Sequence, residues 1–427
     1  MSEWVERPLG QLAYLKIGGT PSRDVPAYWA DGSDQGYPWV SIADLRAGKI
    51  AETSERITDR GVKHSNVKLV KSGTILMTFK LTIGDVAIAG CDLFTNEAIV
   101  ALSPKTPEIS DRFLFHVLPG AARSVVSDAA IKGATLNKEK LEKIRIRFPG
   151  NVRSQTAIAR ILDALDTQIE ATEALIAKQE RVRAGLMQDL FTRGVDENGQ
   201  LRPPREQAPQ LYHQTELGWL PVGWDVEPFG KRIDVIDPNP SHRYPDEAAE
   251  GVPICSTENF EGYDDIDVSV AKTVTEATYR FQNMRCNYHE LDVVFARKGR
   301  IGLARRYGQT RKVFSHTVVT MKPIDASTER SWVLWLARSG VFLGGIEREM
   351  NSNSGVPTLG IEFIKSISVP FPSGQEQARI ASILDGATQR VAAHEAELTK
   401  LRLQKAGLMQ DLLTGKVSVA PLLDSGA

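Results

Sequence analysis

The sequence predicts an α+β protein in which two β-rich units follow one another, each ending in a long helix, with the two helices pairing as an antiparallel coiled coil. The first observation is an internal repeat: residues 155–163 share Gln-x-x-Ile-Ala-x-Ile-Leu-Asp with 377–385, and residues 184–190 and 406–412 are both Ala-Gly-Leu-Met-Gln-Asp-Leu. Both pairs of blocks are separated by the same number of residues. The second observation is a change of pattern, from short β-rich runs outside these blocks to long periodic segments within them.

The composition is that of a globular protein with more than one domain. The chain has 427 residues, of which 42% are hydrophobic and 25% charged, and this length predicts two to four domains. It contains no apolar run near the roughly 20 residues needed to span a bilayer. Residues 1–10 also lack a signal-peptide pattern, so we expect a cytoplasmic protein. The net charge of −1 requires any nucleic-acid-binding surface to be a local basic patch.

The predicted elements follow in order along the chain. The first β-rich unit covers residues 1–150, and its buried strand is expected at 74–77 between turn-forming glycines. A long helix occupies 151–193, and a linker rich in proline and glycine occupies 194–220. The second β-rich unit covers 221–373, with its buried strand at 292–295. A second long helix occupies 374–417, and a tail of residues 418–427 ends the chain.

Steps of four and three residues along both long segments trace a mostly apolar stripe, which is typical of a helix that packs against another helix. About 40 residues at roughly 1.5 Å per residue make a rod about 60 Å long, which suits a spacer or an assembly surface. An ordinary helix pair that only closes the fold is the alternative. The residues predicted to pair the helices are Ile158, Leu162, Leu165, Ile169, Ile176, Ile380, Leu384, Val391, Leu398 and Leu401.

Motifs for catalysis or metal binding are mostly missing from the sequence. There is no GxxxxGK[ST] phosphate loop, and Asp237-Pro238-Asn239-Pro240 only imitates the loop of an amino-methyltransferase, so we interpret it as a turn. His289-Glu290 lacks the second histidine of a zinc protease, and Cys91, Cys255 and Cys286 are too dispersed for a zinc knuckle. We therefore expect no catalytic residue, metal or cofactor in this chain, although a nuclease site can lack an obvious motif.

Three pairs of matching segments are candidates for DNA contacts. In the second unit a strand ends in a glycine-bearing turn rich in arginine, and side chains at such a tip reach phosphates or guanine edges. The candidates there are Arg297, Lys298, Arg300, Arg305 and Arg306, and in the matching turn of the first unit they are Thr78, Lys80 and Thr82. Solvated turns with isolated charges are the alternative reading. If they read bases, replacing Arg297, Lys298 or Arg300 by alanine should each weaken binding by about 1–3 kcal/mol.

The second pair is Asn96 and His316, which we expect at matching positions beside Thr95 and Ser315. The third is the loop containing Asn351 and Asn353, matched to the segment around Lys132. Amide side chains bind adenine edges, but they are also common in turns, and both readings remain open.

Two variable β-rich units, each followed by a helix with these repeated motifs, resemble the specificity subunit of type I restriction-modification enzymes over essentially the whole chain. Further motifs that carry the resemblance are Thr135-Leu136 and Thr358-Leu359, which lead into Phe148-Pro149 and Phe371-Pro372.

The resemblance implies a non-catalytic DNA reader, in which each β-rich unit is a target recognition domain for one half of a split, asymmetric double-stranded DNA site. It implies that the helices set the spacing between the halves and dock two methyltransferase subunits, with restriction and translocase subunits completing the complex. S-adenosylmethionine, ATP and magnesium would be used by those partners. Two other functions remain open: a scaffold whose two domains recognise proteins, and a fused enzyme with its own nuclease.

Overall fold

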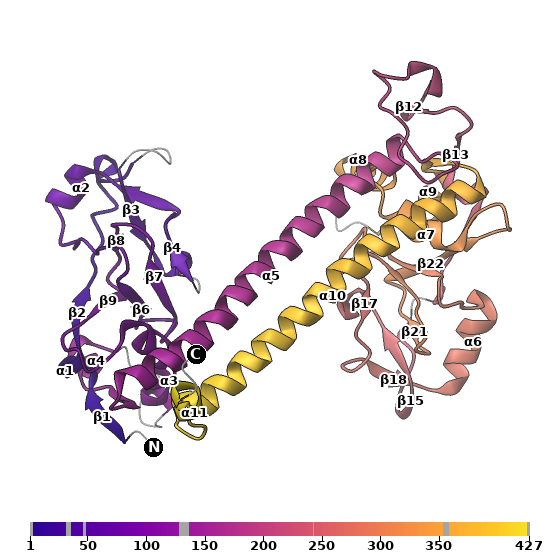
Figure 1. The fold of residues 1–427 in the computed structure, drawn as a ribbon. Helices are drawn as coiled ribbons and strands as arrows, with labels where there is room; N and C mark the ends of the chain where they lie inside the picture. Colours follow the sequence, from indigo (N-terminus) through magenta and orange to yellow (C-terminus); the bar gives the residue numbers. More distant parts are fainter. Residues whose placement is uncertain are drawn as a thin grey trace. The chain divides into compact units, whose positions relative to one another are not determined.

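The computed structural model describes residues 3–30, 36–45, 48–127, 136–241, 243–352 and 358–424. The chain divides into two compact units, the first containing residues 1–174 and 396–427 and the second containing residues 175–395. Each unit therefore holds one β-rich domain together with parts of both long helices (Figure 1). No helix in the described ranges is both long enough and apolar enough to cross a membrane.

Unit 1 is built on a five-stranded sheet in the order β2-β9-β6-β7-β4, beside a three-stranded sheet β5-β3-β8 and a two-stranded ribbon β1-β10. The strands are β1 Trp4–Pro8, β2 Ala13–Ile17, β3 Tyr37–Val40, β4 Lys49–Ile50, β5 Glu55–Ile57, β6 Ile75–Thr78, β7 Val86–Ala89, β8 Phe94–Thr95, β9 Ile99–Pro104 and β10 Arg145–Pro149. The helices are α1 Leu9–Leu12, α2 Asp59–Lys63, α3 Asp111–Ser127, α4 Lys138–Glu142 and α11 Ala420–Asp424, with short 3-10 turns η1 Pro26–Tyr28 and η2 Ile42–Asp44.

Unit 2 repeats this plan with a four-stranded sheet β14-β22-β19-β20, a three-stranded sheet β18-β15-β21 and a ribbon β13-β23. Its strands are β11 Tyr212–Thr215, β12 Gly218–Pro221, β13 Asp225–Pro228, β14 Ile233–Ile236, β15 Glu247–Cys255, β16 Phe260–Glu261, β17 Asp265–Ile266, β18 Lys272–Val274, β19 Val293–Ala296, β20 Ala304–Arg306, β21 Val313–Phe314, β22 Val318–Pro323 and β23 Ser368–Phe371. Its helices are α6 Glu276–Cys286, α7 Arg330–Ala337, α8 Gly340–Ser352 and α9 Ile361–Ser366, with 3-10 turns η3 Pro209–Leu211, η4 Phe229–Lys231 and η5 Thr257–Asn259.

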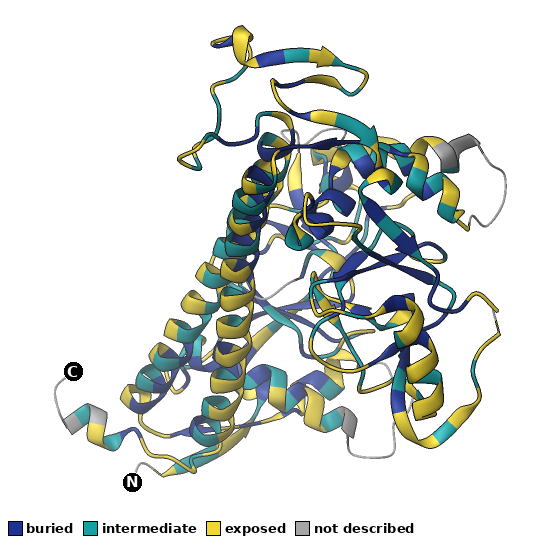
Figure 2. Cartoon of the chain, turned by 90° about the vertical axis from the view of Figure 1, so that its right-hand side faces the viewer, coloured by how far each residue is buried: buried dark blue, intermediate teal, exposed yellow. Residues whose placement is uncertain are grey.

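The central strands are buried on both faces, as their continuous apolar runs predict. In β6, Ile75 and Met77 face the helix-covered core, whereas Leu76 faces a second cluster on the other side of the sheet. The matching strand β19 alternates in the same way, with Val293 on one side and Val294 on the other. Figure 2 shows strands of these sheets as buried, whereas exposed and half-buried residues alternate along most of the long helices.

The long helices are α5, Val152–Thr192, and α10, Gly374–Leu413. Within unit 1 they run antiparallel, because Lys405 pairs with Asp166 whereas Arg402, earlier in α10, pairs with Glu173, later in α5. Within unit 2, α5 and α10 contribute Leu190 and Leu384 to one core cluster. The predicted fold class is therefore confirmed.

The stripe predicted to pair the helices divides into two groups by burial. Ile158, Leu162, Ile380 and Leu384 are fully buried, but each lies in the core of its β-rich unit. Val391 and Leu401 are also buried, whereas the remaining members, Leu165, Ile169, Ile176 and Leu398, are half-buried along the helices. The four fully buried residues of this stripe therefore attach a helix to a domain more than they pair the two helices.

The segment predicted as a linker contains ordered structure. The hairpin β11–β12 spans Tyr212–Pro221, and the stretch before it is held to the start of α10. Glu376 accepts a hydrogen bond from the Val195 amide at 2.9 Å and forms an ion pair with Arg202. The ring nitrogen of Trp224 donates to the same carboxylate at 3.2 Å. Residues 195–224 thus belong to unit 2 and form an ordered segment that is bound to the start of α10.

Candidate nucleic-acid interface

The arginine-rich turn of unit 2 follows β19, and its first arginine is directed into the protein. Arg297 is 5% exposed and forms an ion pair of 2.7 Å with the buried Asp237, and its Nε donates to the His316 carbonyl at 3.0 Å. A guanidinium that is buried and paired in this way cannot reach DNA. The prediction that Arg297 contacts DNA is therefore corrected, and Asp237-Pro238-Asn239-Pro240 is the turn that supplies its partner.

The prediction for Arg305 is also corrected because its side chain is buried, whereas the prediction for Arg306, which is half-buried and paired within the protein, stays a prediction. Arg305 is 4% exposed and donates to the Gly262 carbonyl at 2.6 Å; burial, reinforced by the nearby Arg338, lowers the pKa of its guanidinium to about 10. Arg306 forms an ion pair of 2.6 Å with Asp385 of α10. These two arginines join the sheet of unit 2 to its own loops and to the long helix.

Lys298 and Arg300 remain at the tip of the turn. Arg300 is exposed, with its guanidinium 2.7 Å from the Phe260 carbonyl, and Lys298 is half-buried. Gly299 and Gly302 have φ angles of +77° and +90°, in the left-handed region that glycine adopts without a steric penalty. These two cations are the part of the arginine-rich segment that the structure leaves accessible.

The matching turn of unit 1 has the same backbone but different side chains. Gly84 donates to the Thr78 carbonyl at 3.0 Å, just as Gly302 donates to the Ala296 carbonyl at 3.1 Å. Thr78 is fully buried and its hydroxyl accepts from the Asp85 amide, so the prediction that Thr78 contacts DNA is corrected.

The tip of the unit 1 turn presents three consecutive residues. Lys80 is half-buried with its ammonium 5.6 Å from the Phe79 ring centre, and Thr82 is exposed. Between them Leu81 is 91% exposed with a φ of +63°, although leucine rarely adopts this conformation. An apolar side chain held out at a strained tip is a feature that the charge pattern of the sequence did not reveal.

Asn96 and His316 do not occupy equivalent positions. In unit 1 the Asn96 amide donates to the Val40 carbonyl at 3.0 Å, and in unit 2 the corresponding donor to Cys255 is Ser315. The Asn96 side chain accepts from the Ala98 amide at 3.0 Å, and the Ser315 hydroxyl accepts from the Thr317 amide at 3.4 Å. Asn96 and Ser315 therefore close equivalent turns, so the residue that matches Asn96 is Ser315 and not His316. His316 follows this turn residue and is half-buried.

The third candidate pair falls mostly beyond the part of the chain that the structure describes. Lys132, Asn353 and Thr135 lie outside the described residues. Asn351 lies in the last turn of α8, but its side chain is outside the described set.

The repeated glutamine of the helical motifs has a structural role that the apolar stripe does not reveal. Gln155 accepts from the Ser110 amide at 2.8 Å and donates to the Pro149 carbonyl at 2.8 Å. Gln377 makes the equivalent pair of bonds, from the Glu329 amide and to the Pro372 carbonyl, both at 2.8 Å. The signal in the sequence was the repetition of this glutamine at the start of both helices. The structure shows that both glutamines are fully buried, so their amide groups need these partners.

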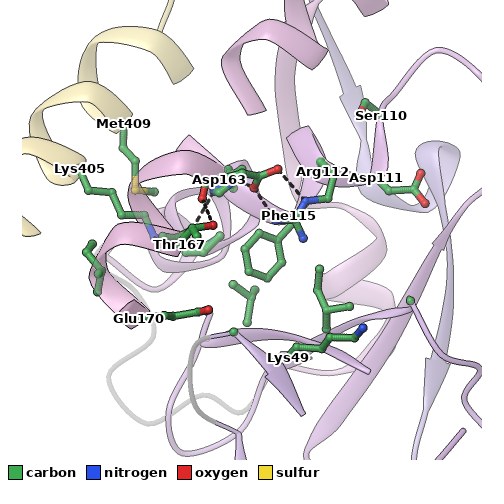
Figure 3. Close-up of a pocket in the computed structure, with 18 of the residues that line it drawn as sticks. Lys49, Ser110, Asp111, Arg112, Phe115, Asp163, Thr167, Glu170, Lys405 and Met409 are labelled. Carbon is green, nitrogen blue, oxygen red and sulfur yellow. Dashed lines mark hydrogen bonds and ion pairs between the residues drawn. The ribbon is translucent and has the colours of Figure 1, made fainter. Parts of the chain in front are cut away.

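The repeated aspartate binds the domain to the same helix about two turns later. In unit 1, Asp163 accepts from Arg112 at 3.0 Å (Figure 3). It also accepts from His116 at 2.7 Å. In unit 2, Asp385 accepts from Arg306 and from the Trp335 ring nitrogen at 2.9 Å. The motif Gln-x-x-Ile-Ala-x-Ile-Leu-Asp is thus the joint between each β-rich domain and its helix.

A cavity of about 930 Å³ lies beside the joint of unit 1. His116, Asp163 and Asp166 border it and have the composition of a metal site within the described ranges. However, Asp163 is paired with Arg112 and Asp166 with Lys405, so both carboxylates already have cationic partners. Burial lowers the pKa of His116, and its hydrogen bond to Asp163 opposes this effect only in part. The group is therefore a salt-bridge network that holds the joint together.

Two equivalent β-rich domains with different side chains on matching turns are attached to two long helices through joints built on the same repeated glutamine and aspartate. This arrangement is that of a protein with two tandem recognition domains. The chain belongs to the family described as the type I restriction modification DNA specificity domain, whose sequence model matches residues 1–181 and 245–403.

The chain is similar to specificity subunits of type I restriction enzymes. It is 26% identical over 239 residues to the type I restriction enzyme MjaIX specificity subunit of Methanocaldococcus jannaschii, covering 55% of this chain and 52% of the relative. It is 22% identical to the MjaVIII specificity subunit of the same organism over 93% of this chain and 90% of the relative. The match to the EcoR124I/EcoR124II specificity subunit of Escherichia coli is 27% identical over 39% of this chain and 41% of that protein. The chain thus spans about half the length of MjaIX and less of the EcoR124I/EcoR124II subunit.

The fold is that of a solved S subunit. The crystal structure of the type I restriction-modification S subunit from M. genitalium aligns over 96% of both chains with a TM-score of 0.61 and 18% identity. A chain from a structure titled for complex assembly and conformational transition of the type I R-M system aligns over 96% of this chain and 97% of its own, with a TM-score of 0.53 and 16% identity.

Proposed function

We propose that this protein is the sequence-specific DNA-binding subunit of a type I restriction-modification complex. Each β-rich domain reads one half of a bipartite, asymmetric site in double-stranded DNA. The long helices set the spacing between the halves and dock two methyltransferase subunits. The covalent chemistry, with its S-adenosylmethionine, ATP and magnesium, belongs to the methyltransferase and to the restriction and translocase subunits.

The observation that carries the proposal is the pair of matching turns with unlike tips. The backbone of Thr78–Gly84 and that of Ala296–Gly302 close with the same hydrogen bond, yet one tip presents Lys80, Leu81 and Thr82 and the other presents Lys298, Gly299 and Arg300. An exposed arginine favours guanine, whereas an apolar side chain favours the thymine methyl group. Two domains that recognise different DNA sequences need the same turn backbone with different side chains at its tip.

The helices support the spacing role by their length. α5 has 41 residues, and at roughly 1.5 Å per residue it extends about 60 Å, which exceeds one turn of DNA at about 34 Å. The repeated joints anchor a domain to each helix through buried hydrogen bonds. A rigid joint on a long helix is the requirement for a fixed distance between two half-sites.

Selection of bound duplexes from a random pool tests the proposal. The full chain co-expressed with its methyltransferase should enrich a site with two unlike halves separated by a fixed number of unspecified bases. A single continuous site, or two identical halves, would contradict the asymmetric reading. If no duplex is retained while protein partners still bind, the function is that of a protein scaffold instead.

A further inference from the structure

A second cavity, of about 580 Å³, lies in unit 1 on the face of the five-stranded sheet opposite α3. It is lined by the edge strand β2, by β9, and by the segment that leads into β6. Three of its lining residues are lysines, namely Lys16, Lys68 and Lys71, and none is an aspartate or glutamate. We call these three residues and their surroundings the lysine groove.

The positive charge of the lysine groove is largely uncompensated. Lys16 is exposed, and its ammonium donates to the Leu69 carbonyl at 3.2 Å. Lys68 is exposed, and among the described residues neither Lys16 nor Lys68 forms an ion pair with a carboxylate. Lys71 alone is paired, with Asp92 at 2.7 Å. A backbone carbonyl orients an ammonium group without neutralising it, so two full charges remain available to a ligand.

Neutral donors and a fourth lysine extend the same surface. Tyr14 is 62% exposed in β2, and the Lys105 ammonium lies 5.1 Å from its ring centre while donating to the Gly10 carbonyl at 2.6 Å. Thr74 and Ser103 contribute hydroxyls to the lining. Ammonium groups combined with hydroxyl donors match the phosphate oxygens of nucleic acids, and lysine binds them as a point charge that carries no sequence information.

Unit 2 lacks this surface at the equivalent strand pair. β2 pairs with β9 through Ala13 and Pro104, and β14 pairs with β22 through Ile233 and Pro323 in the same register. One and three residues further along, Tyr14 and Lys16 of unit 1 are replaced in unit 2 by Asp234 and Ile236. Among the described residues of this strand pair, unit 2 has Lys322 at the position of Ser103, but its ammonium is engaged by Asp292 and the Cys286 carbonyl. The exposed lysine of the strand pair therefore occurs in unit 1, whereas unit 2 has the carboxylate of Asp234 at the position of Tyr14.

We propose that the lysine groove binds the phosphate backbone of double-stranded DNA outside the recognition turns, and that unit 1 thereby grips the duplex independently of its sequence. This inference rests on the proposed function. It adds a DNA-binding surface that positions the duplex and differs between the two domains.

The test is the salt dependence of DNA affinity for the full chain assembled with its methyltransferase. The double variant Lys16→Gln and Lys68→Gln should reduce the slope of log affinity against log salt by about two, one for each phosphate that is no longer neutralised. When the salt concentration rises fourfold, the double variant should therefore lose roughly 16-fold less affinity than the wild type loses. The loss of affinity at low salt should be equal for the selected duplex and for an unrelated one.

A matched control removes two lysines of unit 1 whose charges are compensated. Lys138 and Lys143 pair with Glu142 and Glu139, so Lys138→Gln with Lys143→Gln removes the same net charge without touching the groove. An equal change in slope for this control would overturn the proposal, as would an unchanged slope in the groove variant. A loss confined to the selected sequence would also overturn it, because the lysines would then read bases. If the wild-type assembly binds no duplex at all, the proposed function itself fails, and the inference falls with it.

Discussion

The two neighbouring cations Arg297 and Lys298 differ in accessibility, because their surroundings differ. Arg297 has Asp237 and the His316 carbonyl as partners inside unit 2, whereas Lys298 stands one residue further out on the turn. Asp237 is far from Arg297 in the sequence, so no local pattern could reveal the pairing. The sequence located the basic turn correctly, but which of its cations are accessible depends on long-range contacts.

Replacing Arg297 by alanine should therefore act mainly on stability. The change removes the cationic partner of a buried carboxylate, which costs about 3–5 kcal/mol when one member of a buried ion pair is removed. Lys298→Ala should leave the unfolding transition near that of the wild type and should weaken DNA binding instead. Urea denaturation of both variants, followed by binding of the selected duplex, measures the two effects. A stable Arg297→Ala protein that has lost only its base preference would contradict this assignment.

His116 should make the stability of unit 1 depend on pH. Its pKa is lowered in the folded protein, chiefly by burial, while Asp163, Asp166 and Lys405 surround it. Below its ordinary pKa of about 6.5 the unfolded chain binds the proton more readily, so the contribution of His116 to stability declines as the pH falls. The stability advantage of the wild type over His116→Gln should be largest above pH 7 and should shrink toward pH 5.5. An advantage that grows on acidification would show that the folded state favours the charged imidazole.

At the scale of elements, the repeat in the sequence predicted the two long helices. Its residues, however, form the joints between domain and helix as well as the contact between the helices. Apolar periodicity predicted both long helices, with α5 observed over Val152–Thr192. Periodicity alone cannot distinguish a helical partner from a sheet, and Leu162 and Leu384 prove to pack in the domain cores. Charged residues at these two positions would consequently unfold the domains as well as separate the helices.

The buried glutamines allow the joints to be tested directly. Gln377→Ala should leave the Glu329 amide and the Pro372 carbonyl without their partner, at a cost of about 1–3 kcal/mol. Hydrogen exchange at the Glu329 amide should accelerate, while exchange at the Ser110 amide in unit 1 stays slow; Gln155→Ala should give the reverse result. Gln168→Ala, on the exposed surface of α5, is the control that should change neither amide. If either variant accelerated hydrogen exchange equally at the Glu329 and Ser110 amides, the conclusion that each unit has its own joint would be wrong.

The pairing of the helices within unit 1 is better tested through Lys405 and Asp166 than through the buried leucines. Both side chains are 24% exposed, so a double-mutant cycle should give a coupling of about 1–2 kcal/mol. Arg402 and Glu173 are 60% and 45% exposed and should couple by well under about 1 kcal/mol. Zero coupling for the first pair in the same denaturation experiment would remove it from the helix contact.

At the scale of the whole molecule, duplication explains why so much of the architecture could be predicted. Two copies of one pattern reveal which positions the fold needs, and the matched ribbons β1–β10 and β13–β23 fall where the repeat places them. What differs between the copies is harder to predict. Leu81, exposed at a strained turn, and the lysine groove beside β2 depend on side chains that only the folded sheet brings together.

The most direct test of the central claim, that each domain reads its own half of the DNA site, is a selection experiment on a symmetrised chain. Residues 221–373 are replaced by residues 1–150, since the joints at Gln155 and Gln377 are equivalent, and the chain is assembled with the methyltransferase. Bound duplexes are then selected from a random pool. The account predicts a site with two copies of the half that unit 1 reads in the wild type, separated by a fixed spacer. Recovery of the original asymmetric site, or of one continuous site, would contradict it.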